Sequence, residues 1–181
     1  TLWSRIVYPW IFYWDGIAMR IEWEDGDNEQ FMEVSPPLDP AILHEGMRIR
    51  GLRAGDISRW RISEFCFTTG DINLIHICDE DAQRADFPRV VAPGRFTGSL
   101  IEGAIYAHRI FLHPILFNSS ETYENPVFPQ DKISFNFLIA AVRKTSKNPR
   151  KYVVQLRVTG INQHDIIVIR GSRTLLVQRP Q

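Results

Sequence analysis

The stretch that most constrains the fold is "PGRFTGSLIEGAIYAHRIFLHP", residues 93–114, which has the strongest helical pattern in the chain. Its apolar residues approximate an i, i+3, i+4 spacing, and additional apolar residues off that stripe predict a helix buried on several sides. Gly98 and Gly103 each weaken an isolated helix by about 1 kcal/mol relative to alanine. These glycines make sense if a sheet packs closely against a helix that runs from about Arg95 to His113 and ends at Pro114.

Three segments after this helix predict antiparallel strands. "KISFNFLIAAV" (132–142), "YVVQLRVTGI" (152–161) and "DIIVIRGSRTLLVQ" (165–178) alternate or are rich in β-branched residues, and "NQHD" between the last two predicts a hairpin turn. "GMRIRGL" (46–52) predicts a further short strand. A run of antiparallel strands after one long buried helix indicates an α+β protein. The expected architecture is a single hot-dog domain, a curved antiparallel sheet wrapped around a long central helix.

Two shorter helices are expected before the long one. "AGDISRWRISEFCFTTG" (54–70) predicts about three helical turns, with Asp56 as the N-cap and Gly70 as the stop. Residues 79–85 predict one more short helical turn. Asp71 and His76 lie between the two, five residues apart, and a turn or short loop there could aim both side chains at one point.

The first residues, "TLWSRIVYPWIFYW", predict an aromatic-rich N-terminal arm, residues 1–40, ahead of a domain that spans residues 41–181. "SPPLDP" (35–40) has three prolines in six residues and fits a linker between the two. The apolar part of the arm is much shorter than the ~20 residues that cross a bilayer, and it lacks a signal-peptide cleavage site. We expect a cytoplasmic protein whose arm packs on the body, borders a ligand pocket or borders a dimer interface.

The charge balance and the cysteines exclude several classes of partner. Lys and Arg number 21, as do Asp and Glu, so a net charge of zero favours neither nucleic acid nor an anionic membrane. A small or hydrophobic partner is the better expectation. Cys66 and Cys78 make no disulfide framework and are expected to be reduced and buried. No spacing of His and Cys indicates zinc, so neither a metal nor another cofactor is expected.

A polar motif stands between the two short helices, in "TGDINLIHICDEDA" (69–82). This segment resembles the signature of MaoC-like (R)-specific enoyl-CoA hydratases, G-D-x-N-P-x-H-x5-A, and five residues stand in its register: Gly70, Asp71, Asn73, His76 and Ala82. "VVAPGRFTGSLI" (90–101) is similar to the family's opening of the central helix, with Gly94 at the glycine position. The resemblance extends from about Gly46 to Gln178. It departs from the family at Leu74, Cys78 and Pro93, which spare Asp71 and His76 but alter their surroundings.

The residues of the motif suit addition of water to an unsaturated thioester. The reaction needs a water deprotonated as it attacks C3 and a proton delivered to C2, and a carboxylate close to an imidazole can do both. Asp71 and His76 are therefore the candidate catalytic pair. Asn73 would hold the loop or a ligand through its amide.

Two further residues are candidates for substrate binding. Gly94, at the start of the long helix, would let a thioester approach the backbone N–H groups that stabilise an enolate oxygen. Arg95 would meet an anionic group of the ligand, or else form a surface salt bridge. The basic loop 143–151 fits a solvated hairpin better than a phosphate clamp.

The resemblance implies a lyase that reversibly hydrates an enoyl thioester or dehydrates a 3-hydroxyacyl thioester, with CoA or a carrier protein as the thiol. It also implies a homodimer. One alternative is a cyclase or isomerase of secondary metabolism, in which a substrate hydroxyl replaces water. Another is a non-catalytic hot-dog subunit. The fold alone does not decide among these functions.

Overall fold

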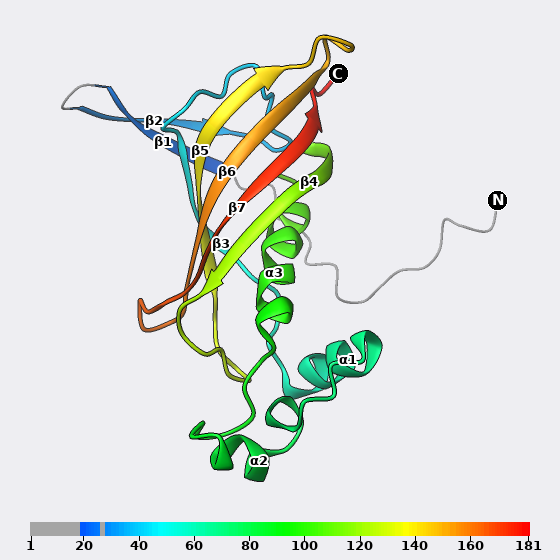
Figure 1. Ribbon diagram of the computed structural model, residues 1–181. Coiled ribbons are helices and arrows are strands. Elements are labelled where there is room, and N and C mark those ends of the chain that lie inside the picture. Colours follow the sequence, from blue (N-terminus) through cyan, green and yellow to red (C-terminus); the bar gives the residue numbers. More distant parts are fainter. Residues whose placement is uncertain (1–18, 26–27) are drawn as a thin grey trace.

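A computed structural model describes residues 19–25 and 28–181 of the chain. In that part, seven strands form one sheet, and three α-helices and one short 3-10 helix accompany it (Figure 1). The strands are β1 (Met19–Asp25), β2 (Asn28–Val34), β3 (Arg48–Arg53), β4 (Leu112–Tyr123), β5 (Ser134–Lys144), β6 (Lys151–Ile161) and β7 (Ile167–Gln178). The helices are α1 (Arg59–Thr69), η1 (Leu74–His76), α2 (Asp79–Arg84) and α3 (Gly94–Ala107).

The sheet is antiparallel throughout, with the strand order β2-β1-β3-β5-β6-β7-β4. It curves, and α3 runs along its inner face, while α1 and α2 lie beyond one end of the strands (Figure 1). The three strands predicted after the long helix are β5, β6 and β7. The predicted architecture, a curved antiparallel sheet wrapped around a long helix, is therefore confirmed.

The core lies between the sheet and α3. Phe135, Phe137 and Ile139 alternate along β5 and are fully buried, as are Ile101 and Ile105 on α3. Burying a side chain of this size is worth about 1.5–3 kcal/mol relative to leaving it exposed. The period-two apolar pattern of β5 and the helical pattern of α3 thus meet in one core and fix the position of α3 against the sheet.

The helix α3 is shorter than predicted. It ends at Ala107, because Arg109 adopts a left-handed backbone conformation with φ of 51° and turns the chain back toward the sheet. Leu112, expected to be in the helix, begins β4 instead. Pro114 therefore does not end a helix but lies inside an edge strand, a place where its missing N–H is tolerated.

The helix α1 ends as predicted and begins elsewhere. Gly70 follows it with a left-handed φ of 75°, the conformation that glycine adopts most readily. The N-cap is Ser58 rather than the expected Asp56, because the Ser58 hydroxyl accepts a hydrogen bond from the backbone N–H of Arg61 at 3.4 Å. Asp56 lies two residues too early to make that contact. The short turn predicted at residues 79–85 is α2.

The segment before residue 41 contributes two strands to the sheet. β1 and β2 form a hairpin whose first strand pairs with β3, and the proline-rich segment 35–40 connects β2 toward β3. Residues 1–18, where the arm was expected to border a pocket or an interface, lie outside the described residues.

The two cysteines are free thiols that form no disulfide with each other. Cys66, on α1, is fully buried as predicted. Cys78 is only half-buried, contrary to the prediction, because it precedes α2 at the surface and its thiol donates a hydrogen bond to Glu80 at 2.8 Å.

Candidate active site

The motif between α1 and α2 folds into a tight loop. The left-handed Gly70 reverses the chain at the end of α1, so Asp71 begins the loop. Asn73 is the N-cap of η1, and its Oδ1 accepts a hydrogen bond from the N–H of Ile75 at 3.5 Å. Asn73 is exposed and acts on the loop, one of the two roles that the sequence left open for it. His76 then follows as the last residue of η1.

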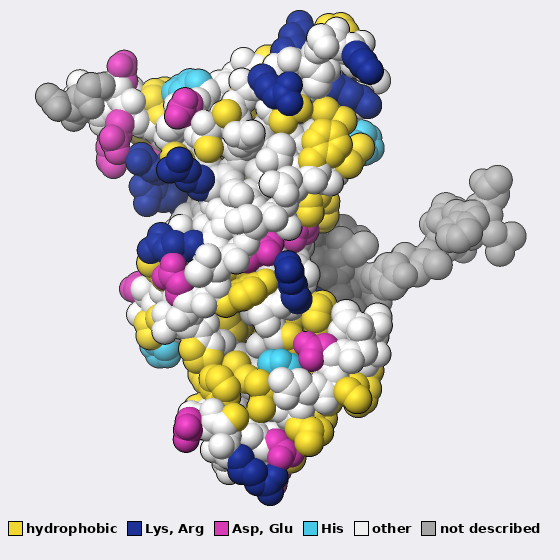
Figure 2. Space-filling model, in the orientation of Figure 1, with side chains coloured by type: hydrophobic (Ala, Val, Ile, Leu, Met, Phe, Trp, Pro, Cys, Tyr) yellow, Lys and Arg dark blue, Asp and Glu magenta, His cyan; other side chains and the backbone are white. Residues whose placement is uncertain are grey.

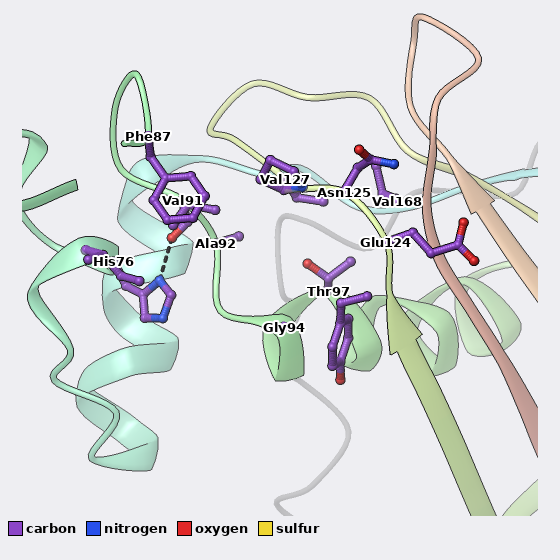
Figure 3. Close-up of a pocket in the computed structure, with 13 residues that line it drawn as sticks. His76, Phe87, Val91, Ala92, Gly94, Thr97, Glu124, Asn125, Val127 and Val168 are labelled. Atoms are coloured by element: carbon purple, nitrogen blue, oxygen red, sulfur yellow. Dashed lines mark hydrogen bonds between the residues drawn. The ribbon is translucent and has the colours of Figure 1, made fainter. Parts of the chain in front are cut away.

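The ring of His76 is fixed by the segment that leads into α3. Its Nδ1 lies 2.7 Å from the carbonyl oxygen of Val91, and the N–H of Val91 donates to the carbonyl oxygen of Ile75 at 3.2 Å (Figure 3). Because a carbonyl oxygen can only accept a hydrogen bond, Nδ1 must carry the proton and donate it. In the neutral ring, Nε2 is therefore the nitrogen that can accept a proton.

His76 lines a cavity of about 310 Å³. One wall comes from the loop and the segment before α3, and the opposite wall from the end of β4 and the chain that follows it (Figure 3). Most of the lining is apolar. The lining residues are Ile75, His76, Phe87, Val91, Ala92, Gly94, Thr97, Tyr123, Glu124, Asn125, Pro126, Val127 and Val168.

The N-terminus of α3 opens into the same cavity. Gly94 is its first residue and lines the cavity, and the N-cap, Pro93, has no side-chain hydrogen bond to the helix. The N–H of Thr97 donates to the carbonyl oxygen of Pro93 at 3.1 Å, so the N–H groups of residues 94–96 precede the first intrahelical hydrogen bond. These donors, with the positive end of the helix dipole, favour a negative charge at this point.

The structure therefore brings His76 and Gly94 to one cavity, whereas Asp71 and Arg95 do not line it. Asp71 lies two residues beyond the end of α1 at Thr69, and its carboxylate adds to burial in raising the pKa of the Cys66 thiol. In the described part of the chain, no hydrogen bond or ion pair joins Asp71 to His76. Arg95 forms an ion pair with Glu121 at 3.0 Å, as in the salt-bridge alternative.

The opposite wall escaped sequence reasoning. Tyr123, Glu124 and Asn125 line the cavity at the end of β4, a strand that the sequence did not predict. The side-chain amide of Asn125 donates to the carbonyl oxygen of Ile167 at 2.7 Å, and Glu124 forms an ion pair with Arg170 at 2.9 Å. These contacts attach the wall to the first residues of β7.

The basic hairpin lies far from this cavity along the strands. Exposed Arg143, Lys144, Lys147 and Arg150 stand at the β5–β6 turn, where Figure 2 shows Lys and Arg gathered at one end of the molecule. The strand register places this turn beside the end of β7 at Gln178, whereas the cavity adjoins the start of β7 at Val168. This placement favours the solvated-hairpin interpretation.

Within residues 19–25 and 28–181, no group of three or more His, Cys, Asp or Glu side chains could hold a metal ion. No described helix has the length and apolar character to cross a membrane.

A comparison with known protein families shows to which of them this chain is related. The model of the MaoC-like domain matches residues 46–162, most of the chain and all of the loop and cavity segments up to the end of β6. The chain belongs to the MaoC-like domain family. No protein with a curated description matches it in sequence.

Solved structures give the same fold. A MaoC-like dehydratase from Rhodospirillum rubrum is 20% identical with a TM-score of 0.69, over 80% of this chain and 99% of that one. An R-hydratase from Pseudomonas aeruginosa is 20% identical with a TM-score of 0.63, over 80% and 88%. A 3R-hydroxyacyl-ACP dehydratase complex from Mycobacterium tuberculosis is 18% identical with a TM-score of 0.62, over 74% and 97%. At these identities the similarity establishes the hot-dog fold of this MaoC-like chain.

Proposed function

We propose that this MaoC-like chain is a lyase that adds water to an enoyl thioester and, in reverse, removes water from a 3-hydroxyacyl thioester. The observation that carries the proposal is the state of His76. Its Nδ1–H is committed to Val91, which leaves Nε2 as a proton acceptor in a mostly apolar cavity. A positioned imidazole is the commonest general base in enzymes.

The proton transfers follow from that arrangement. In hydration, the water oxygen bonds to C3 as one of its protons passes to Nε2 of His76, and that proton is then delivered to C2 of the enolate, which restores the neutral imidazole. Asp71 is the second group that would hold the water and relay the proton. Its support is its place in the chain, since it begins the loop that ends in His76. Catalytic hydrogen bonds are often long or absent before substrate binds.

The start of α3 supplies the remaining requirement. As water adds to C3, negative charge develops on the thioester oxygen. Gly94, whose N–H is one of the free donors of the first turn, lines the cavity that His76 lines, and the helix has no side-chain cap. Preorganised donors of this kind commonly stabilise an oxyanion by about 3–4 kcal/mol each. The apolar lining suits the acyl chain of a thioester. The thiol part of that thioester would be CoA or a carrier protein.

We also propose a homodimer. β4 is an edge strand of the sheet, and Ile115, Leu116 and Phe117 on it are exposed. An apolar edge strand with unpaired backbone groups readily pairs with another chain. A second copy of the same strand would cover these side chains.

The function is tested with a series of enoyl-CoA thioesters from crotonyl-CoA to dodecenoyl-CoA. The proposal predicts loss of the enoyl absorbance and formation of the 3-hydroxyacyl thioester with at least one of them. Loss of absorbance with a cyclic or isomeric product would favour the cyclase or isomerase. No reaction with any CoA or carrier-protein thioester would support a non-catalytic subunit.

A further inference from the structure

A tyrosine at the end of β4 occupies the space beside the first turns of α3. Gly94 and Gly98 are four residues apart and share one face of the helix. A Cβ built on Gly94 would lie 2.9 Å from two ring carbons of Tyr123, and one built on Gly98 would lie 3.2 Å from the Tyr123 hydroxyl. The ring therefore lies directly on the surface of the helix at Gly94 and Gly98. This strip along the two glycines, called the track below, is open only because glycine has no Cβ.

The far end of this track is closed by charged side chains. Glu121 accepts from Arg95 at 3.0 Å and from Arg173 at 2.8 Å, and Arg173 is almost fully buried. Arg173 also donates to the carbonyl oxygen of Gly98 at 3.2 Å and pairs with Glu102. Removing one partner from a buried ion-pair network is costly, so an apolar chain would not displace this cluster.

The near end of the track opens on the candidate active site. Tyr123 lines the cavity beside Gly94, and its ring, on a residue that is 41% exposed, covers the glycine surface at that point. The cavity, at about 310 Å³, lies at the lower end of the roughly 300–1,000 Å³ typical of small-molecule sites. Removal of the ring would uncover Gly94 and Gly98, and Glu121 lies next along the helix, 3.8 Å from a Cβ built on Gly98.

We propose that Tyr123 determines the acyl-chain specificity of the site by blocking this track, so that the protein accepts thioesters with a short acyl chain. The inference rests on the proposed function, since it assigns the cavity to the acyl group of a thioester. It adds the residue that limits the length of that group. The aromatic ring of Tyr123 blocks the track, and its hydroxyl is not needed for the block.

Binding of saturated thioesters tests the block by Tyr123 separately from catalysis, because these ligands carry no double bond to hydrate. The dissociation constants of butyryl-CoA and octanoyl-CoA would be measured by isothermal titration calorimetry with wild type, Tyr123→Ala and Tyr123→Phe. Thr122→Ala is the matched control, an exposed neighbour on the same strand that does not line the cavity. The hydration assay on the same proteins reports the proposed function independently.

Wild type and Thr122→Ala should bind butyryl-CoA more tightly than octanoyl-CoA. Tyr123→Ala should tighten octanoyl-CoA by at least about tenfold, since each newly buried methylene favours binding, and should change butyryl-CoA less than about threefold. Tyr123→Phe should keep the wild-type preference. The inference is overturned if Tyr123→Ala leaves the octanoyl-to-butyryl ratio unchanged, or if wild type binds neither ligand. If wild type binds butyryl-CoA more tightly than octanoyl-CoA but hydrates no enoyl thioester, the proposed reaction is rejected, whereas the role of Tyr123 in limiting acyl length stands.

Discussion

The carbonyl oxygen of Ser120 on β4 occupies the space in which a Cβ on Gly171 of β7 would lie. The two strands pair around this point, where Glu121 lies opposite Gly171. Because the obstructing atom belongs to the backbone, it cannot rotate away as a side chain could. Only glycine therefore lets the edge strand β4 approach β7 closely enough to hold the wall of the cavity.

The first prediction concerns this contact. Gly171→Ala should lower the free energy of unfolding by roughly 1–3 kcal/mol, the usual cost of overpacking, as measured by urea denaturation. The matched control is Gly103→Ala on α3, where a Cβ would meet nothing within 4 Å. It should raise stability by about 0.5–1 kcal/mol through helix propensity. A Gly171→Ala protein as stable as wild type would show that the strands can separate at no cost.

The second prediction concerns pH and the ion pair that joins the proline-rich segment to the C-terminus. Hydrogen bonds from the Arg179 guanidinium to Asp39, at 2.6–3.1 Å, hold the pKa of that carboxyl below its ordinary value of 3.8. The pair therefore stabilises the fold above that value, and the contribution is lost as the pH falls through the lower folded pKa.

Because Arg179 is exposed and Asp39 is only partly buried, Asp39→Asn should cost only about 0.5 kcal/mol at neutral pH. The difference from wild type should shrink as the pH falls below 3.8. Glu33→Gln, which removes an exposed carboxyl from β2, controls for the change in net charge. Thermal melts from neutral to acid pH provide the measurement, and a difference that persists unchanged in acid would contradict the assignment to this pair.

The third prediction separates the two thiols. Cys66 is fully buried on α1, and burial raises its thiol pKa. It should not react with a thiol reagent until the protein unfolds, since the thiolate is the reactive form. Cys78 is partly accessible, and its hydrogen bond to Glu80 raises its pKa, so it should react slowly at neutral pH. Labelling native Cys78→Ser protein should modify no thiol, and fast labelling of that variant would place Cys66 at the surface.

The fourth prediction tests the homodimer. Light scattering at micromolar concentration should give the mass of two chains. Phe117→Lys should shift the mass toward one chain, because a lysine on an exposed edge strand opposes pairing. Phe31→Lys on the other edge strand, β2, is the matched control and should leave the mass unchanged. A monomeric wild type would contradict the proposal, and dissociation by Phe31→Lys alone would move the interface to β2.

The sequence predicts best what depends on near neighbours. The alternation along β5 follows from its burial against α3, and the left-handed Gly70 follows from the place of a glycine after a helix. The position of His76 in a loop followed from the spacing of the motif. In each case the pattern itself lies within a few consecutive residues.

What the sequence did not predict depends on long-range contacts. β4 contains Pro114 and a polar run from Asn118 to Glu121, and as an edge strand it has no regular buried alternation. The position of Tyr123 against Gly94 is set by the pairing of β4 with β7, which no local pattern specifies. One wall of the candidate site was therefore beyond sequence reasoning.

The two residues of the candidate catalytic pair differ in their position, since His76 lines the cavity and Asp71 does not. Asp71→Asn keeps the shape of the side chain and removes its charge, and it should reduce turnover by about 10²–10⁴-fold if Asp71 joins the water in the substrate complex. Stability should change little, since Asp71 is only half-buried and lies outside the core. Full turnover in this variant would leave His76 as the sole acid–base residue.

The most direct test of the account is the turnover of His76→Asn on the best enoyl thioester. Asparagine can keep an amide N–H near the position of Nδ1, and thus the hydrogen bond to Val91, while it removes Nε2. His164→Asn, in the exposed β6–β7 turn, is the matched control. With the melting temperature preserved, the account predicts that His76→Asn loses turnover by about 10²–10⁴-fold and that His164→Asn keeps it. A folded His76→Asn protein with wild-type turnover would contradict the account.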